Sequence, residues 1–475
     1  MSTISTDIAV IGAGSGGLSV AAGAVQLGAR VVLFERDRMG GDCLNHGCVP
    51  SKALLAAGHA AHQARTSRRF GVDTAAVEVD FAAVHAHVQD VIAGIAPHDS
   101  VERFEGLGVQ VIKAEARFVA PRSLEADGTR IDARRIVIAT GSSPAVPPIP
   151  GLDQTPFLTN ETLFGLTRCP EHLIIIGAGP IGMEMAQAHR RLGAAVTVLD
   201  GMRMLGKDDP EAVDIVRLKM LSEGIALHES CKVLEVAPSA AGVQVRVEDA
   251  DGRTLELQGS HLLVAVGRTP NVSALNLDAA GIEHDRRGIK VDARLRTSNK
   301  KVYAIGDVTG GFQFTHVAGY HAGIVIRNAL FRLPARARSD VIPWVTYTDP
   351  ELAHVGLLES QARELHGSAV RVLRSSFEDN DRARAERAGP GQIKLVLGRR
   401  GRLLGATIVG ARAGELLAPW VLALEKGLKL SDMAGTIVAY PTLAEIGKRV
   451  AGSYYTDRLF SSRTRCLVRF LLNFA

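Results

Sequence analysis

Apolar and polar segments alternate in the same order in two parts of the chain. In the first part, the apolar run 7–11 leads into Gly12-Ala13-Gly14-Ser15-Gly16-Gly17, a longer apolar run covers 18–27, and a second short run, 30–34, ends at Glu35. A short apolar run predicts a buried strand and a longer one a helix. The order therefore predicts a strand–helix–strand unit with a glycine turn after its first strand.

The second part repeats this order. Residues 173–176 lead into Gly177-Ala178-Gly179-Pro180-Ile181-Gly182, a helix is expected to end near Leu192, and a strand over 196–199 ends at Asp200. We therefore predict a structural repeat: two Rossmann-like dinucleotide-binding domains in an α/β protein.

Both units have the spacing of a dinucleotide-binding motif. An acidic residue follows the first glycine by 23 positions, Glu35 after Gly12 and Asp200 after Gly177. In such motifs the first glycine makes a tight turn, the second lets a pyrophosphate approach, the third allows close helix packing, and the acid binds a ribose hydroxyl. A glycine-rich turn without a ligand is the alternative, but strand, helix and acid together favour two dinucleotides. The candidate cofactor-binding residues are Gly12, Gly14, Gly17 and Glu35 in the first unit, and Gly177, Gly179, Gly182 and Asp200 in the second.

Each unit also closes with a related strand. Residues 136–139 lead into Thr140-Gly141, and residues 262–266 lead into Gly267-Arg268. A third apolar segment, 302–305, is followed by Gly306-Asp307. The two closing turns add Thr140, Gly141, Gly267 and Arg268 to the candidate cofactor-binding residues.

The stretch 40–52, Gly-Gly-Asp-Cys-Leu-Asn-His-Gly-Cys-Val-Pro-Ser-Lys, holds two cysteines five positions apart. In a continuous helix their Cα atoms would lie about 8.7 Å apart, whereas a disulfide tolerates roughly 7 Å. If Cys43 and Cys48 bond, the backbone between them must leave the helix, and Asn45 and Gly47 are residue types that permit a turn. A helix can start near Cys48, where its N-terminus and Lys52 favour thiolate over thiol. Two cysteines that merely fall close together in a loop are the alternative.

A redox disulfide needs a two-electron partner beside it, so we assign FAD to the unit with the cysteines and the nicotinamide cofactor to the second unit. Asp200 favours the free ribose hydroxyl of NADH over the 2′-phosphate of NADPH. Arg203 and Lys207 lie just beyond it and weaken that preference.

The 40–52 stretch resembles the GGxCxNxGCxPSK motif of the pyridine nucleotide-disulfide oxidoreductases, the flavoproteins that include dihydrolipoamide dehydrogenase, glutathione reductase and mercuric reductase. The resemblance implies that Cys48 faces the flavin, that Cys43 exchanges with substrate, and that Lys52 lies near the flavin N5. Gly41, within the same motif, is a further candidate for the flavin site.

The resemblance also extends to acids outside this stretch. It implies that Asp307 binds the ribityl chain of FAD and that Glu184 lies near the nicotinamide. A solvated acid in the first helical turn, complementing the helix dipole, is the alternative for Glu184.

Residues 344–351, Trp-Val-Thr-Tyr-Thr-Asp-Pro-Glu, resemble the opening of the interface domain of the same family, which implies a homodimer. Strands are expected at 393–397 and 403–409 and helices at 411–424 and 428–433. We expect an FAD-binding domain over 1–150 and 273–340, an NAD(P)-binding domain over 151–272, and a dimerisation domain over 341–475.

One position near the C-terminus narrows the function. In the dihydrolipoamide and glutathione enzymes a histidine, paired with a following glutamate, precedes a proline and acts as acid–base catalyst across the dimer. This chain has Tyr440 there, and Glu445 follows. A phenol with pKa near 10 cannot shuttle protons at neutral pH as an imidazole with pKa near 6.5 can. A tyrosine resembles the mercuric reductases, in which a soft metal ion meets the cysteine pair.

We therefore expect a FAD- and NAD(P)H-dependent oxidoreductase that passes two electrons through Cys43 and Cys48 to a soft metal ion or an unidentified disulfide. The alternatives are a dihydrolipoamide dehydrogenase and a flavin-binding redox sensor without small-molecule turnover. Two departures from the mercuric reductases count against a full match: the chain has neither an N-terminal metal-binding domain nor an adjacent cysteine pair in its tail. No residue is assigned as a ligand of a resident metal.

Composition bounds the partners. The 475 residues are 46% hydrophobic and 22% charged, with a formal net charge of +5 and arginine pairs scattered along the chain, which disfavours nucleic-acid binding. Five cysteines without a framework of pairs, a short polar start and no apolar run of 18 residues predict a cytoplasmic protein. The tail, 459–475, is basic and apolar. We expect it to pack against the partner subunit with Cys466 as a passive thiol; weak contact with a membrane surface, or metal transfer by Cys466, is the alternative.

Overall fold

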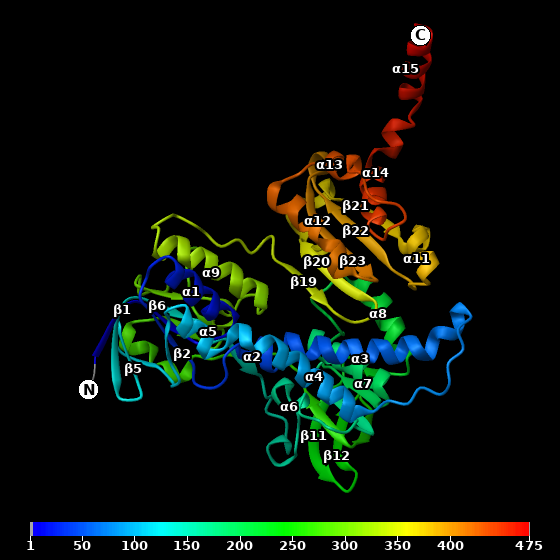
Figure 1. Cartoon of the computed structure of the whole chain (residues 1–475). Coiled ribbons are helices and arrows are strands. Elements are labelled where there is room, and N and C mark those ends of the chain that lie inside the picture. The colour runs from blue at the N-terminus through cyan, green and yellow to red at the C-terminus, as the bar shows by residue number, and fades with distance from the viewer. Residues whose placement is uncertain (1–2, 475) are drawn as a thin grey trace. The chain divides into compact units, whose positions relative to one another are not determined.

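The computed structural model describes residues 3–474 and divides into two compact units (Figure 1). The first unit runs to Met202 and resumes over Ile225–Arg338. The second comprises Arg203–Gly224 and the chain from Ser339 onward.

A mixed sheet lies at the centre of the first dinucleotide-binding repeat. Its parallel strands follow the order β3-β2-β1-β6, and β18 pairs with β6 in parallel while β5 and β4 extend the sheet antiparallel. These strands are β1 (Thr3–Ile11), β2 (Val31–Phe34), β3 (Gln110–Ile112), β4 (Arg117–Ala120), β5 (Ser123–Ala126), β6 (Thr129–Ile138) and β18 (Val302–Ala304). The helices of this repeat include α1 (Ser15–Gln26), α2 (Gly41–Asn45), α3 (Cys48–Thr66), α4 (Phe81–Ile95), α5 (Val101–Gly106) and α9 (Thr315–Ala329).

The second repeat has the same strand order. Its parallel sheet is β10-β9-β8-β14, which matches β3-β2-β1-β6 position by position. The elements are β8 (His172–Ile176), α7 (Pro180–Leu192), β9 (Ala195–Leu199), β10 (Ala226–His228) and β14 (His261–Val264), with a three-stranded sheet of β11 (Lys232–Ser239), β12 (Gly242–Glu248) and β13 (Thr254–Gly259). The predicted repeat and the α/β fold class are confirmed.

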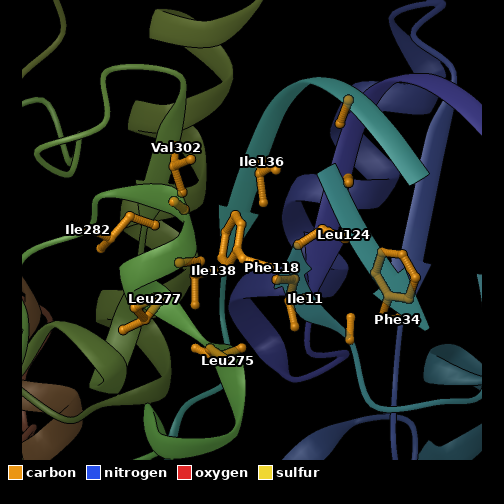
Figure 2. Packing of buried hydrophobic residues seen from close by; sticks show 14 of the residues in the cluster. Ile11, Phe34, Phe118, Leu124, Ile136, Ile138, Leu275, Leu277, Ile282 and Val302 are labelled. Atoms are coloured by element: carbon orange, nitrogen blue, oxygen red, sulfur yellow. The ribbon is translucent and has the colours of Figure 1, made fainter. Parts of the chain in front are cut away.

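Two strand pairings connect distant segments of the first unit. The return of residues 302–304 to the first sheet places Val302 opposite Ile136. Figure 2 shows Leu277 and Ile282, from the segment that precedes β18, packed beside Ile138 of β6 in one buried cluster. Beyond the closing strands, β7 (Ser142–Pro144) and β15 (Arg268–Pro270) pair antiparallel, so the two closing turns meet.

The second unit is built on one antiparallel sheet. Its order is β19-β20-β23-β22-β21, and Trp420 and Phe377 are fully buried in its core. The elements are α8 (Pro210–Ser222), β19 (Pro343–Thr346), β20 (Glu351–Gly356), α10 (Glu359–His366), β21 (Arg371–Ser376), α11 (Asp381–Glu386), β22 (Gln392–Leu397), β23 (Leu403–Gly410), α12 (Ala413–Lys426), α13 (Leu430–Gly435), α14 (Glu445–Leu459) and α15 (Ser462–Leu472).

Segment 203–224 lies inside the predicted 151–272 domain but groups with the C-terminal unit. The reason is local chemistry. Helix α8 packs against β20 and β23, and Lys394 of β22 binds Asp209 and Glu211 at the start of this helix, at 2.8 and 2.9 Å. The predicted domain boundaries otherwise remain predictions. Within residues 3–474, no helix has both the length and the apolar character that crossing a bilayer requires.

Candidate active site

The two motif cysteines lie on either side of a helix break. Cys43 belongs to α2, and Cys48 is the first residue of α3. The chain leaves the helix at His46 and Gly47. This agrees with the prediction that two cysteines five positions apart can bond only if the backbone between them is not helical. Asn45 contributes differently from the prediction: it stays helical, and its side chain donates to Met39 O and Gly41 O, at 3.0 and 2.9 Å. Both cysteines are free thiols in this structure, and their side chains hydrogen-bond to each other.

The surroundings of the two cysteines shift their pKa values in opposite directions. The hydrogen bond from Cys43 lowers the pKa of Cys48 to about 6, against an opposing effect of burial, with further help from Thr315 and Lys52. The same hydrogen bond and burial raise the pKa of Cys43. Cys48 Sγ lies 3.3 Å from Thr315 Oγ1, and Thr315 is the first residue of α9. The N-termini of α3 and α9 therefore meet at Cys48, and both helix dipoles favour its thiolate.

This polarisation predicts a pH dependence. Because the pKa of Cys48 is lowered to about 6, its thiolate is present above that pH and is lost as the pH falls through it. In the anaerobically reduced protein, alkylation of Cys48 by iodoacetamide, followed by peptide mapping, should show a midpoint near pH 6. Lys52→Met should move the midpoint upward, because it removes a nearby positive charge. A midpoint at the ordinary thiol pKa, roughly 8.5, would contradict this polarisation.

Lys52 is held by an acid from the second repeat. Its Nζ lies 2.8 Å from Glu184 Oε2, and the Glu184 side chain is only 6% exposed. The alternative of a solvated Glu184 is therefore wrong: the carboxylate is buried in α7 and paired. The pair connects the helix of the cysteine motif to the second glycine turn.

Hydrogen bonds and an ion pair hold the segment that contains the two cysteines. Asn160, the first residue of α6 (Asn160–Leu163), donates to Asp42 Oδ1 and His46 O at 3.0 and 3.1 Å. Arg268 Nη2 lies 3.2 Å from Asp42 Oδ2. Arg268 also donates to the carbonyl and hydroxyl oxygens of Ser142, both at 2.7 Å. This segment is thus tied to the junction of the two repeats.

The same junction holds Asp307. Its Oδ2 accepts from Ser142 Oγ at 2.6 Å and lies 3.8 Å from Arg268 Nε. Burial raises the pKa of Asp307, and the Ser142 hydrogen bond opposes this. Thr140 and Asn271 exchange side-chain-to-backbone hydrogen bonds across the same turns, so the predicted Thr140-Gly141 and Gly267-Arg268 segments come together here.

The two motif acids each hold a glycine turn. Glu35 accepts from Ala13 N at 2.8 Å, and Asp200 accepts from Ala178 N at 2.6 Å. The second oxygen of each accepts a further backbone N–H, two positions on. The sequence predicted ribose recognition for both acids but did not predict this backbone role.

The glycine turns themselves fit dinucleotides. An added Cβ on Gly17 or Gly182 would lie 1.8 or 1.9 Å from a backbone oxygen of the same turn, so helix and turn approach as closely as predicted. At Gly179 an added Cβ would meet nothing within 4 Å. Both α1 and α7 have glycine N-caps without a side-chain hydrogen bond, so no side chain of the N-cap residue occupies the start of either helix. Such helix N-termini suit the pyrophosphates of FAD and NAD(P)H.

The remaining predicted residues lie in the second unit. Tyr440 is 70% exposed, and its hydroxyl donates to Asp381 Oδ2 at 3.1 Å. This hydrogen bond raises the pKa of Tyr440 above its usual value. Glu445 begins α14 and accepts from Thr442 N at 3.3 Å.

Sequence reasoning missed four residues that touch the site: Asp42, Ser142, Asn160 and Thr315. Asp42 lies within the 40–52 stretch and Ser142 directly follows Gly141, so the neighbouring motifs were a usable signal for these two. Thr315 begins α9, a helix for which no site residue was predicted. Asn160 lies in a short connecting helix with no motif, so only the fold reveals it.

Two dinucleotide-binding repeats with a polarised cysteine pair where they meet define a flavin-linked disulfide oxidoreductase. The chain belongs to the pyridine nucleotide-disulphide oxidoreductase family, which matches residues 6–322, and the family's dimerisation domain matches residues 342–451. It is an enzyme of a family that binds FAD and uses NAD(P)H, and its dimerisation domain indicates a homodimer.

Named relatives carry more than one activity. The chain is 37% identical over 442 residues to mercuric reductase of Bacillus cereus, covering 92% of this chain and 70% of the relative. It is 35% identical over 457 residues to dihydrolipoyl dehydrogenase of Geobacillus stearothermophilus, covering 94% and 96%. A Cu(II) complex of the HOCl-induced flavoprotein disulfide reductase RclA from Escherichia coli is structurally similar, with a TM-score of 0.83, 28% identity, and coverage of 94% and 99%. Because the activities match at similar identity, similarity does not assign the electron acceptor.

Proposed function

We propose that this enzyme uses NADH to reduce a soft metal ion at Cys43 and Cys48, with mercuric ion as the best candidate. The observation that carries the proposal is Tyr440. Its phenol stands where the dihydrolipoamide enzymes have an acid–base histidine, and the hydrogen bond to Asp381 raises its pKa further from neutrality. Disulfide exchange needs proton transfer at each sulfur, whereas binding of a soft cation by thiolates does not need a proton donor.

The cysteine environment suits such an ion. Cys48 is a thiolate at neutral pH, and a soft cation that binds it displaces the proton of Cys43, so both sulfurs become ligands. FAD, when bound, supplies two-electron transfer from NADH to this site. In the net reaction, NADH and Hg(II) give NAD⁺, a proton and Hg(0). The similar Cu(II) complex of the Escherichia coli flavoprotein supports metal chemistry on this scaffold.

The proposed preference for NADH rests on Asp200. Its carboxylate is held at the second glycine turn, where it would repel a 2′-phosphate. Arg203 is engaged in an ion pair with Asp214 at 3.3 Å. We expect kcat/KM for NADH to exceed that for NADPH by about tenfold or more, and steady-state kinetics with each cofactor tests this. Equal or reversed values would contradict it.

A panel of acceptors tests the proposal as a whole. The purified holoenzyme should oxidise NADH with mercuric ion and show little turnover with lipoamide or glutathione disulfide. Strong lipoamide turnover would instead identify a dihydrolipoamide dehydrogenase. Slow NADH oxidation with every acceptor would favour a redox sensor.

Tyr440→His tests the acid–base argument separately. We expect lipoamide turnover to rise about tenfold or more, because an imidazole restores proton transfer near neutral pH, with little change in mercuric ion reduction. Tyr455→His, at a half-buried tyrosine of α14, is the control. Unchanged lipoamide turnover in Tyr440→His would remove the main support for the proposal.

A further inference from the structure

The last helix of the described residues lies outside the core of its own unit. Helix α15 begins after Ser461, whose side chain caps it by accepting from Thr464 N at 3.3 Å. None of residues 459–474 is buried. The helix lies beyond residues 342–451, which match the dimerisation domain, and Figure 1 shows it (red) extending past α14, away from the sheet of its unit.

One face of this helix is apolar. Leu467, Phe470, Leu471 and Phe474 recur at the i, i+3, i+4 and i+7 positions, so they lie in one stripe along the helix and the turn that ends it. Each of the four is more than half exposed. The rings of Phe470 and Phe474 contact each other edge to face, with centroids 4.9 Å apart. An exposed contiguous apolar stripe marks a surface that another partner covers.

The charged side chains of the helix all have the same sign. Arg463, Arg465 and Arg469 lie on α15, and the chain has no acidic residue after Asp457. Arg465 and Arg469 are four positions apart and lie on the side opposite the apolar stripe. The side chains of these three arginines form no ion pair with another of the described residues. A partner for this surface must offer both an apolar interior and negative charge.

From the sequence we expect the tail to pack against the partner subunit, but a second copy of this chain carries a formal net charge of +5, whereas the arginines of the tail favour negative charge. We therefore propose that α15 docks on the surface of an anionic lipid bilayer. Its 11 residues span about 16 Å, roughly half of the hydrocarbon core of about 30 Å. The helix therefore lies in the plane of the interface, with Phe470 and Leu471 among the acyl chains and Arg465 and Arg469 at the lipid phosphates. This surface would bring the enzyme to the membrane without changing its dithiol chemistry.

Co-sedimentation of the holoenzyme with vesicles tests the proposal. We expect binding to phosphatidylcholine vesicles that contain about one third phosphatidylglycerol, and little binding to phosphatidylcholine alone. Binding should weaken as salt rises, because salt screens the arginine–phosphate attraction. A chain ending at Phe460 should lose binding while its NADH-dependent acceptor reduction stays unchanged.

Two double substitutions in the helix separate the contribution of charge from that of apolar contact, and a third, outside the tail, is the control. Arg465→Glu with Arg469→Glu should weaken binding about tenfold or more, whereas Arg399→Glu with Arg402→Glu, an equal charge change at exposed residues outside the tail, should not. Phe470→Ser with Phe474→Ser should also weaken binding. Binding that is absent from the anionic vesicles, or equal in the two arginine variants, overturns the proposal. So does dissociation of the dimer, measured by light scattering, in the chain ending at Phe460, because the partner subunit would then cover the stripe.

Discussion

Replacing Cys48 with serine is expected to reduce NADH-dependent acceptor turnover at least about a thousandfold. A serine hydroxyl cannot form a disulfide or a thiolate at neutral pH, so electrons that reach the flavin have no route onward through Cys43. NADH should still reduce the flavin in this variant, because the two glycine turns are untouched. The long-wavelength absorbance band that a thiolate produces beside a flavin should disappear in an anaerobic NADH titration.

Cys169→Ser is the matched control. Cys169 is half-buried in the same unit, its Sγ lies 3.8 Å from Leu192 O, and burial raises the pKa of its thiol. The exchange removes one sulfur without touching the motif, so the band and the turnover should both remain. A band or a turnover that survives in Cys48→Ser would show that this residue is not the electron-transfer thiol.

Local chemistry explains why the two repeats were predictable from sequence. A strand that ends in a glycine turn and leads into a helix is specified by neighbouring residues. Gly17 is an example, because the backbone oxygen of Gly12 occupies the space that a side chain at position 17 would need. The helix break between Cys43 and Cys48 was likewise predicted from the five-residue spacing of the two cysteines. The start of α3 at Cys48 follows from the same stretch.

Contacts between distant segments were not predictable in this way. Arg268 meets Asp42 only because β7 and β15 pair, and nothing near Asp42 in the sequence indicates a partner so far along the chain. The grouping of 203–224 with the second unit depends equally on a distant residue, Lys394. Glu184 shows the other limit: its position in the motif suggested a functional acid, but its burial and its pairing with Lys52 emerge only from the fold.

Lys394→Met should lower the free energy of unfolding by about 3–5 kcal/mol. The Lys394 side chain is 3% exposed, and its Nζ binds Asp209, Glu211 and Glu359 at 2.8, 2.9 and 2.8 Å. Arg374 completes this Lys394 cluster by donating to both oxygens of Glu211, at 2.7 and 2.6 Å. Removing the central cation leaves the equally buried Asp209 carboxylate without its ion-pair partner. Denaturant unfolding of the holoenzyme, followed by circular dichroism, measures the loss.

A second substitution distinguishes a lost ion pair from lost packing. Asp209→Asn added to Lys394→Met removes the stranded charge and keeps a side chain that can cap α8, so part of the stability should return. Lys426→Met, at an exposed pair with Glu425, should cost less than about 1 kcal/mol. The stability that the cluster provides also depends on pH. The hydrogen bond between Glu211 and Arg374 lowers the pKa of Glu211 to about 2. The contribution of Glu211 to stability is therefore complete above the ordinary carboxyl pKa and is lost as the pH falls towards 2. If the double variant is no more stable than Lys394→Met, the buried charge is not what holds α8 against β22.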